Sequence, residues 1–361
     1  MNALAQRLAG LIRAQGPLSV AQFMALALMD PDYGYYTQQD PFGADGDFIT
    51  APEVSQMFGE LLGLWLVQAW RNQGSASALR LIELGPGRGT MMADVLRAAA
   101  RVAPEFVAAA EVTLIEASPR LRAAQQQRLA TAPVTVSWSP TLKLEALSGP
   151  LFVLANEFFD ALPVRQFLRV GEKWHERVVT VGRQGDLEFA IAPMAAQALA
   201  PTPGRPPAQD GDLFELCPSG LALCENLAAT IARQGGAALI IDYGYDGKVG
   251  FGDTLQALRA HHPVPVLADP GEADVTAHVD FAALALSARH GGAAVYGPRP
   301  QGSFLTALGI GPRCAALARS TPDAATVLRR QLDRLCAEDQ MGQLFKALAL
   351  LPQHAPRPDG F

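Results

Sequence analysis

Short apolar runs alternate with helical patterns through the central part of the chain, and this alternation constrains the fold more than any other feature. Strands are predicted at 79–84, 112–115, 134–136, 151–155 and 238–241, and helices at 91–102, 119–129 and 221–233. Such an order is typical of an α/β protein with a mostly parallel sheet and helices on both faces. Ligands bind to such sheets beyond the carboxyl ends of the strands, so residues that carry chemistry should follow directly after strands.

Composition excludes several classes of protein. The 361 residues carry a formal net charge of −6 and only 18% of them are charged, so the chain has no general positive field for nucleic acid. The four cysteines lack Cys-x-x-Cys spacing and partner histidines, so neither a zinc site nor a disulfide framework is predicted. No apolar run approaches the roughly 18 residues of a membrane span, and a soluble protein is expected.

The first 78 residues are predicted to form an N-terminal helical cap with an aromatic loop. An apolar face across 1–15 favours an ordinary first helix, although Arg7 and Arg13 without acidic neighbours also fit a transit peptide. Residues 30–48, rich in glycine, aspartate and aromatic rings, are expected either to pack down permanently or to close over a ligand.

A helix start is predicted at the end of this aromatic stretch. Thr50 and Glu53 have the Thr-x-x-Glu spacing of a capping box. Apolar residues then recur at spacings of three and four as far as Ala69, so one long helix is expected.

Residues 166–212 are predicted to be a β insertion in the α/β core, which comprises 79–165 and 213–361. The segments 166–170 and 173–181 alternate around Gly171 and Glu172 as a hairpin does, and 187–191 forms a third short strand. Prolines recur in 193–212, so a mobile surface connection is expected there.

A strand, a glycine turn and a helix meet at Glu83-Leu84-Gly85-Pro86-Gly87-Arg88-Gly89-Thr90. The glycines allow the backbone to approach a ligand closely. The third glycine comes one residue too early for a dinucleotide fingerprint, and the Glu-x-Gly-x-Gly-x-Gly form favours S-adenosylmethionine. The next strand ends at Glu116, which could accept hydrogen bonds from a ribose diol. A tight turn that binds no ligand is the simpler alternative.

Further polar clusters follow the other strands. Trp138 could cover an adenine ring or lie in the core. Asn156-Glu157-Phe158-Phe159-Asp160 places an amide, two carboxylates and two rings beyond the fourth strand, and Ile241-Asp242-Tyr243-Gly244 ends the fifth. Four histidines, His261, His262, His278 and His290, lack metal-site pairing, and only His278 stands out by its surroundings.

Together these blocks resemble the MidA-type S-adenosylmethionine-dependent methyltransferases. The blocks that carry the resemblance are Gly34-Tyr35-Tyr36-Thr37, Gly46-Asp47-Phe48-Ile49-Thr50, Ser55-Gln56-Met57-Phe58-Gly59-Glu60, the glycine turn, the Asn156 to Pro163 block, Ile241-Asp242-Tyr243-Gly244, Gly252-Asp253-Thr254-Leu255-Gln256, His278-Val279-Asp280-Phe281 and Met341-Gly342-Gln343-Leu344-Phe345-Lys346. The resemblance spans about 16–350. It implies a Rossmann-like class I methyltransferase sheet and S-adenosyl-L-methionine as the cofactor.

The patterns and the resemblance together assign the site residues. Cofactor contacts are expected from Gly34, Thr50, Glu83, Gly85, Gly87, Gly89, Glu116, Trp138 and Asn156, and no metal is expected. Carboxylates bind a guanidinium bidentately, so Glu157 and Asp160 are the expected catalytic pair if arginine is the acceptor. Glu157 could instead contact the cofactor, and Asp160 could only cap a helix.

The family includes the mitochondrial protein arginine methyltransferase that assists assembly of respiratory complex I. The resemblance therefore implies methylation of a protein side chain, with an arginine of a complex I subunit or a similar client as the acceptor. It implies a cytoplasmic place in a bacterium and the mitochondrial matrix in a eukaryote, and a homodimer is compatible with the low charge content. The alternatives are a client-binding assembly factor that has lost catalysis and, less favoured by the glycine spacing, a nicotinamide-dependent oxidoreductase.

Overall fold

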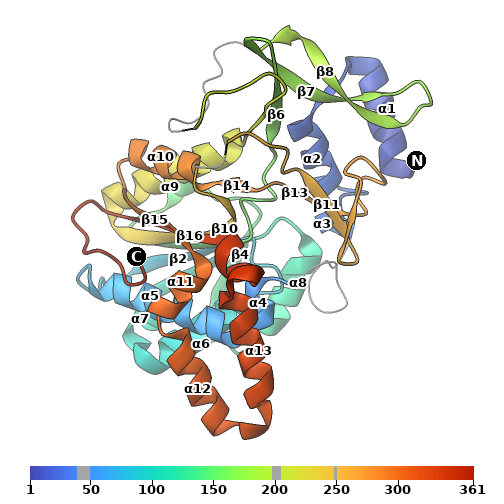
Figure 1. Ribbon diagram of the computed structural model, residues 1–361. Coiled ribbons are helices and arrows are strands. Elements are labelled where there is room, and N and C mark those ends of the chain that lie inside the picture. The colour runs from blue at the N-terminus through green and yellow to red at the C-terminus, as the bar shows by residue number, and fades with distance from the viewer. Residues whose placement is uncertain (39–48, 197–204, 248–249) are drawn as a thin grey trace. The chain divides into compact units, whose positions relative to one another are not determined.

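The computed structural model describes residues 1–38, 49–196, 205–247 and 250–361. The chain divides into two compact units, each made from three separate stretches of the sequence (Figure 1). The sheet unit comprises 49–159, 223–244 and 284–361. The insertion unit comprises 1–48, 160–222 and 245–283.

The sheet unit is built on strands in the order β15-β16-β10-β5-β2-β3-β4. Their bounds are β2 Leu79–Leu84, β3 Ala110–Ile115, β4 Val136–Ser139, β5 Leu151–Asn156, β10 Gly236–Tyr245, β15 Ala294–Pro300 and β16 Phe345–Leu351. Strands β4, β3, β2, β5 and β10 are parallel, and β16 runs antiparallel to both of its neighbours. The chain leaves β2 toward β3 and β4 and then returns to β5 on the other side of β2, which creates a topological switch point between β2 and β5.

Helices cover both faces of this sheet, as the sequence predicts. Helices α5 (Gln56–Arg71) and α6 (Thr90–Val102) lie on one side, and α9 (Pro218–Gln234) and α10 (Phe281–His290) lie on the other (Figure 1). Apolar side chains of α5, α6 and α7 (Pro104–Ala109) share one buried core with alternate residues of β2, β3 and β5. Helices α11 (Gln301–Ala307), α12 (Ile310–Ser320) and α13 (Ala325–Cys336) extend this core toward the C-terminus.

The fold class and most predicted elements are confirmed. Strand β2 has the predicted bounds, and α6, α8 (Pro119–Arg128) and α9 lie where helical patterns were found. Strand β4 begins at Val136, so the predicted strand at 134–136 starts two residues too early. The strand is displaced because its ladder to β3 starts with Val136 opposite Val112 and ends with Ser139 opposite Ile115.

The predicted long helix after Thr50 is wrong, because it is broken at Ser55. Helix α4 covers only Ala51–Val54, and Ser55 has an extended backbone (φ −161°, ψ 138°) before α5 begins. The capping box is also absent: Thr50 is the N-cap of α4 but makes no side-chain capping bond, and Glu53 accepts a hydrogen bond from the Thr90 hydroxyl. Ser55 caps α5 by accepting a hydrogen bond from the N–H of Met57.

The insertion unit combines N-terminal helices with the β insertion. Helices α1 (Ala3–Gln15), α2 (Val20–Met29) and α3 (Tyr35–Gln38) accompany a sheet in the order β1-β7-β6-β9, with β8 paired to β7. The strand bounds are β1 Leu18–Ser19, β6 Arg165–Val170, β7 Lys173–Val181, β8 Leu187–Ala195 and β9 Leu213–Leu216, and a second sheet holds β11 Gln256–Arg259, β12 His262–Val264 and β13 Asp274–Thr276. The hairpin at Gly171 and Glu172 is confirmed by the pairing of Val170 with Lys173.

This division differs from the boundaries expected from the sequence. Residues 49–78 belong with the sheet, because the apolar face of α5 packs into the sheet core. Residues 1–38 and 245–283 belong with the β insertion, because α1 and α2 share a core with Val164, Val179 and Val275.

The parts of the aromatic loop at 39–48 and of the proline-rich connection at 197–204 lie outside the described residues. Within the described part of the chain, no helix is both long and apolar enough to cross a membrane.

Candidate functional site

Three buried polar side chains project from the same face of the sheet at the ends of adjacent parallel strands. Glu83 on β2 lies opposite Leu114 on β3 and Leu154 on β5. Glu116 and Asn156 each follow one of these leucines by two residues, so by strand alternation they point to the same side as Glu83. All three are buried, whereas carboxyl and amide side chains usually lie at the surface.

Glu83 is a buried carboxyl group with an unsatisfied oxygen. Its side chain is 1% exposed, and its Oε2 has no hydrogen-bond partner among the residues that the structure describes. Burial, reinforced by repulsion from Glu116, raises the pKa of Glu83 to about 8, although the backbone N–H of Met92 acts in the opposite direction. Asn156 presents a similarly buried Oδ1 for which the described part of the chain offers no donor. These oxygens suit a ligand that brings positive charge or hydrogen-bond donors.

The glycine turn between β2 and α6 adopts a backbone that other residues disfavour. Gly85, Gly87 and Gly89 have φ values of 60°, 52° and 78°, all in the left-handed region. A side chain at Gly85 would also place its Cβ 2.8 Å from Cδ2 of Phe158. The turn therefore needs glycine for its conformation and, at Gly85, for close packing against Phe158.

Hydrogen bonds from neighbouring residues hold Glu116 at the end of β3. Its Oε1 accepts from the N–H of Ser118 at 2.8 Å, and its Oε2 accepts from Nε2 of Gln125 at 3.1 Å. Burial raises the pKa of Glu116, and these two bonds act against that shift. A carboxylate has more lone pairs than these two bonds use, so Glu116 can accept further hydrogen bonds from a diol.

Trp138 and Glu116 are linked through Gln125, which the sequence analysis did not identify. The indole N–H of Trp138 donates to Oε1 of Gln125 at 2.9 Å, and Nε2 of Gln125 also donates to the carbonyl of Gly87 at 2.7 Å. Trp138 is half-buried and packs beside the sheet core. Gln125 gives little signal in the sequence, because it stands first of three consecutive glutamines in a polar helix.

Glu157 follows β5 in a left-handed backbone conformation (φ 49°), which is uncommon for a residue other than glycine. Its Oε1 accepts hydrogen bonds from the N–H of Ala51 at 2.9 Å and from Nδ2 of Asn156 at 3.0 Å. The next two residues are anchored by Asp242, whose Oδ2 accepts from the N–H groups of Phe158 and Phe159 at 3.1 and 2.9 Å. The strand-end cluster at Asp242 therefore shapes the loop that carries Glu157.

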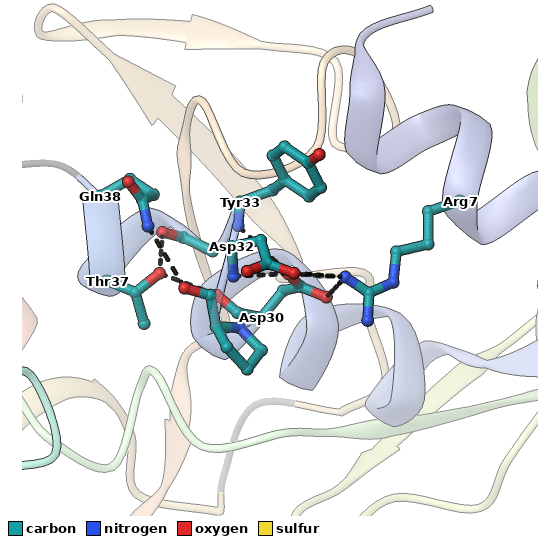
Figure 2. A network of polar contacts seen from close by, with 8 residues as sticks. Arg7, Asp30, Asp32, Tyr33, Thr37 and Gln38 are labelled. Carbon is teal, nitrogen blue, oxygen red and sulfur yellow. Dashed lines mark hydrogen bonds and ion pairs between the residues drawn. The ribbon is translucent and has the colours of Figure 1, made fainter.

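Gly34 and Asp160 belong to the insertion unit, whereas the other predicted site residues belong to the sheet unit. Position 34 requires glycine, because the Cβ of any other residue would lie only 2.4 Å from the backbone N of Asp30 and would clash with it. Figure 2 shows the turn around Asp30, whose carboxylate pairs with Arg7 and accepts hydrogen bonds from the N–H groups of Asp32 and Tyr33. Thr37 closes this turn by donating to the carbonyl of Asp30 at 2.8 Å (Figure 2).

Asp160 lies in a buried polar region of the insertion unit. Its carbonyl accepts a hydrogen bond from the N–H of Ala277, the residue before His278. The hydroxyl of Tyr36 donates to Asp274 at 2.9 Å, and burial, together with the charges of Asp274 and Asp160, raises the pKa of Tyr36. Several of the family-like blocks thus meet here, and none of the helices in the described part of the chain begins or ends next to Asp160.

Comparisons with known proteins agree with this geometry. Residues 61–299 match the model of a family described as "Putative S-adenosyl-L-methionine-dependent methyltransferase". The chain is 39% identical to "Protein arginine methyltransferase NDUFAF7, mitochondrial" from Mus musculus, over 94% of this chain and 82% of the relative. The Homo sapiens protein of the same name is 37% identical over 94% of this chain and 81% of its own length.

A solved structure is similar along almost the whole chain. It is a superfamily member from Burkholderia thailandensis bound to S-adenosyl-homocysteine, with 30% identity, a TM-score of 0.89 and coverage of 99% of this chain and 94% of that one. The family match covers more than half of the chain and coincides with the strands and the glycine turn described above. The chain therefore belongs to this family of S-adenosyl-L-methionine-dependent methyltransferases.

Proposed function

We propose that this enzyme transfers the methyl group of S-adenosyl-L-methionine to an arginine side chain of a protein. The identity of the acceptor is supported by the relatives that carry the name protein arginine methyltransferase and align over 94% or more of this chain. The site for the donor is supported above all by the buried Glu83, whose unsatisfied oxygen and raised pKa match a cationic ligand.

The cofactor fits the polar groups at the strand ends. Its methionine half carries an ammonium and a sulfonium, and we place it by Glu83 and Asn156, which lie on either side of the switch point between β2 and β5. Its ribose diol would donate to Glu116, and its adenine would lie beside the ring of Trp138. The backbone of Gly85, Gly87 and Gly89 would pass close to the cofactor, and Thr50 and Gly34 remain expected contacts.

Methyl transfer from a sulfonium is an in-line displacement, so the protein mainly has to hold donor and acceptor in line at short distance. An arginine side chain is cationic and presents a planar fork of donors, which carboxylates bind. We propose that Glu157 and Asp160 are the carboxylates that orient the guanidinium, and that one of them receives the proton lost on transfer. For Glu157 the proposal is supported by its fixed position, since the bonds from Ala51 and Asn156 hold Oε1 in place.

The expected client is a subunit of respiratory complex I or a similar protein, in the bacterial cytoplasm or in the mitochondrial matrix of a eukaryote. The relatives named here are called mitochondrial. A homodimer remains part of this proposal. The competing function is a client-binding assembly factor without catalysis, which would keep the fold and lose methyl transfer.

The test combines binding and turnover. Calorimetry with S-adenosylmethionine and, separately, NADH should show binding of the sulfonium compound only. The protein is then incubated with methyl-labelled donor and a lysate from cells that lack it, and the labelled client is analysed by mass spectrometry. Label on an arginine supports the proposal. Label on another residue type contradicts the acceptor, and cofactor binding without any transferred label favours the assembly factor.

A further inference from the structure

The side chain of Gln125 is buried in a helix that is otherwise largely polar. Leu121 and Gln125 are the fully buried residues of α8, and Gln125 has no exposed surface. The next two glutamines, Gln126 and Gln127, are exposed. A buried polar group costs free energy unless its hydrogen bonds are made, so this position needs a specific reason for its amide.

The amide of Gln125 uses both of its donors and its acceptor within the candidate cofactor site. Nε2 donates to the Gly87 carbonyl at 2.7 Å and to Oε2 of Glu116 at 3.1 Å, and Oε1 accepts from the indole of Trp138 at 2.9 Å. The carbonyl and the carboxylate can only accept, and the indole can only donate. These partners therefore fix the amide in a single orientation.

These bonds connect three separate segments through one side chain. Gly87 follows β2, Glu116 follows β3, and Trp138 lies within β4, so the amide ties together the ends of three adjacent parallel strands. Gln125 also lies against the end of the glycine turn, since a Cβ at Gly89 would be 3.4 Å from its Cγ. The spacing between the turn, the carboxylate and the ring thus depends on this residue.

We propose that Gln125 is a positioning residue for the nucleoside half of S-adenosylmethionine. It holds the Gly87 backbone, the Glu116 carboxylate and the Trp138 ring at the separations that the adenosine group requires, without having to touch the cofactor. The inference rests on the proposed placement of the ribose at Glu116 and of the adenine at Trp138.

Two substitutions separate the amide's hydrogen bonds from its volume. Gln125→Met keeps an unbranched side chain of similar size and removes all three bonds. Gln125→Glu keeps an acceptor for Trp138 but cannot donate when ionised, and it brings a second carboxylate toward Glu116. The matched control is Gln126→Met, which makes the same change one residue away on the exposed side of α8.

Affinity is measured by calorimetry for S-adenosylhomocysteine and for 5′-methylthioadenosine, which lacks the amino-acid half. Gln125→Met should weaken binding of both ligands about tenfold or more, and Gln125→Glu at least as much, because buried partners lose their donors. Gln126→Met should bind both ligands within about twofold of the unaltered protein. Thermal unfolding is recorded for every variant. If Gln125→Met does not fold, Gln125→Glu carries the test, because it keeps the length and shape of the side chain.

The outcomes distinguish this inference from the proposed cofactor placement. Normal affinity in Gln125→Met and Gln125→Glu, with only a lower melting temperature, would show that Gln125 merely packs α8 and would overturn the inference. Glu116→Ala serves as the reference variant. If Glu116→Ala also binds both ligands normally, the cofactor placement itself fails; if it weakens binding while the Gln125 variants do not, only the positioning role fails.

Discussion

The carboxylate of Glu157 accepts a hydrogen bond at Oε1 from the backbone N–H of Ala51, 2.9 Å away. Ala51 is the first residue of α4, so Glu157 satisfies one of the N–H groups that have no partner within the helix. The proposed catalytic carboxylate is therefore also a structural one, and the two roles can be separated by choice of substitution.

Replacing Glu157 by Gln should abolish turnover and preserve the fold. The amide oxygen can still accept from Ala51, but the negative charge that binds a guanidinium is lost. We expect the rate of methyl transfer to fall about 100-fold or more. The affinity for S-adenosylhomocysteine should stay within about threefold. Transfer of labelled methyl groups and calorimetry measure the two quantities.

Glu157→Ala provides the comparison for this prediction. It removes the capping acceptor as well as the charge, and should cost about 1 kcal/mol of stability beyond Glu157→Gln in urea unfolding. Methylation at the normal rate by Glu157→Gln would remove Glu157 from the catalytic assignment.

Gly87→Val should eliminate cofactor binding without unfolding the protein. Valine is strained at a φ of 52°, which costs stability. Its branched side chain would also occupy the space in which the backbone of the turn is expected to contact the cofactor. Gly171→Val is the matched control, because Gly171 has a φ of 58° with open space around its Cβ position in the hairpin turn of the insertion unit. Both variants should lose about 1–2 kcal/mol of stability, but only Gly87→Val should lose binding of S-adenosylhomocysteine by calorimetry. Equal affinities would contradict the site.

Much of the sheet could be predicted because its strands are short, largely apolar runs. Strand β2 matches its predicted bounds, since every residue from Leu81 to Leu84 is buried and the glycine turn ends the run sharply. The family-like blocks also located the residues at the strand ends. Local patterns were sufficient where burial and backbone conformation are set by neighbours in the sequence.

The features that were missed depend on contacts between distant residues. The break at Ser55 was not predicted because Glu53, which fits a local capping box, bonds instead to Thr90, 37 residues away. Gln125 was not found because nothing local distinguishes it from Gln126 and Gln127. Only tertiary packing buries one of the three, and only the structure supplies its partners.

Asp242→Asn should impair catalysis through the loop that carries Glu157. The carboxylate of Asp242 accepts N–H bonds from Phe158 and Phe159 at Oδ2 and from Tyr243 at Oδ1, so an amide nitrogen in its place must face at least one donor. We expect a loss of about 2 kcal/mol in urea unfolding. The maximal rate should fall about tenfold or more because Glu157 is misplaced, while affinity for S-adenosylhomocysteine changes little. Asp323→Asn, at an exposed position, controls for the loss of charge. An unchanged maximal rate would show that the loop does not depend on Asp242.

Glu83 should make the stability of the free protein fall as pH rises from about 4.5 to about 8. Its pKa is raised to about 8 in the folded protein from a usual value of 4.5, because of burial first and repulsion from Glu116 second. Between these two values the folded state holds a proton that the unfolded state has released, so the derivative of unfolding free energy with pH is negative. The full penalty above pH 8 is on the order of 5 kcal/mol. Glu83→Gln should lack this part of the pH dependence, whereas the contribution of Glu116, whose pKa is also raised, should remain in both proteins.

The same group should release a proton when the cofactor binds. At pH 7 the free protein holds Glu83 mainly protonated, and a cationic sulfonium or ammonium beside the carboxylate favours its ionised form. Calorimetric titration with S-adenosylmethionine in buffers of different ionisation enthalpy should therefore show release of up to about one proton per site at pH 7, decreasing as pH rises beyond 8. Glu83→Gln should bind more weakly and release none. Because Gln keeps the size of the side chain and can still accept from the N–H of Met92, a loss of proton release with the fold intact would identify Glu83 as the group that meets the positive charge. Equal proton release by both proteins would instead assign the linkage to another carboxylate and would place the positive end of the cofactor away from β2.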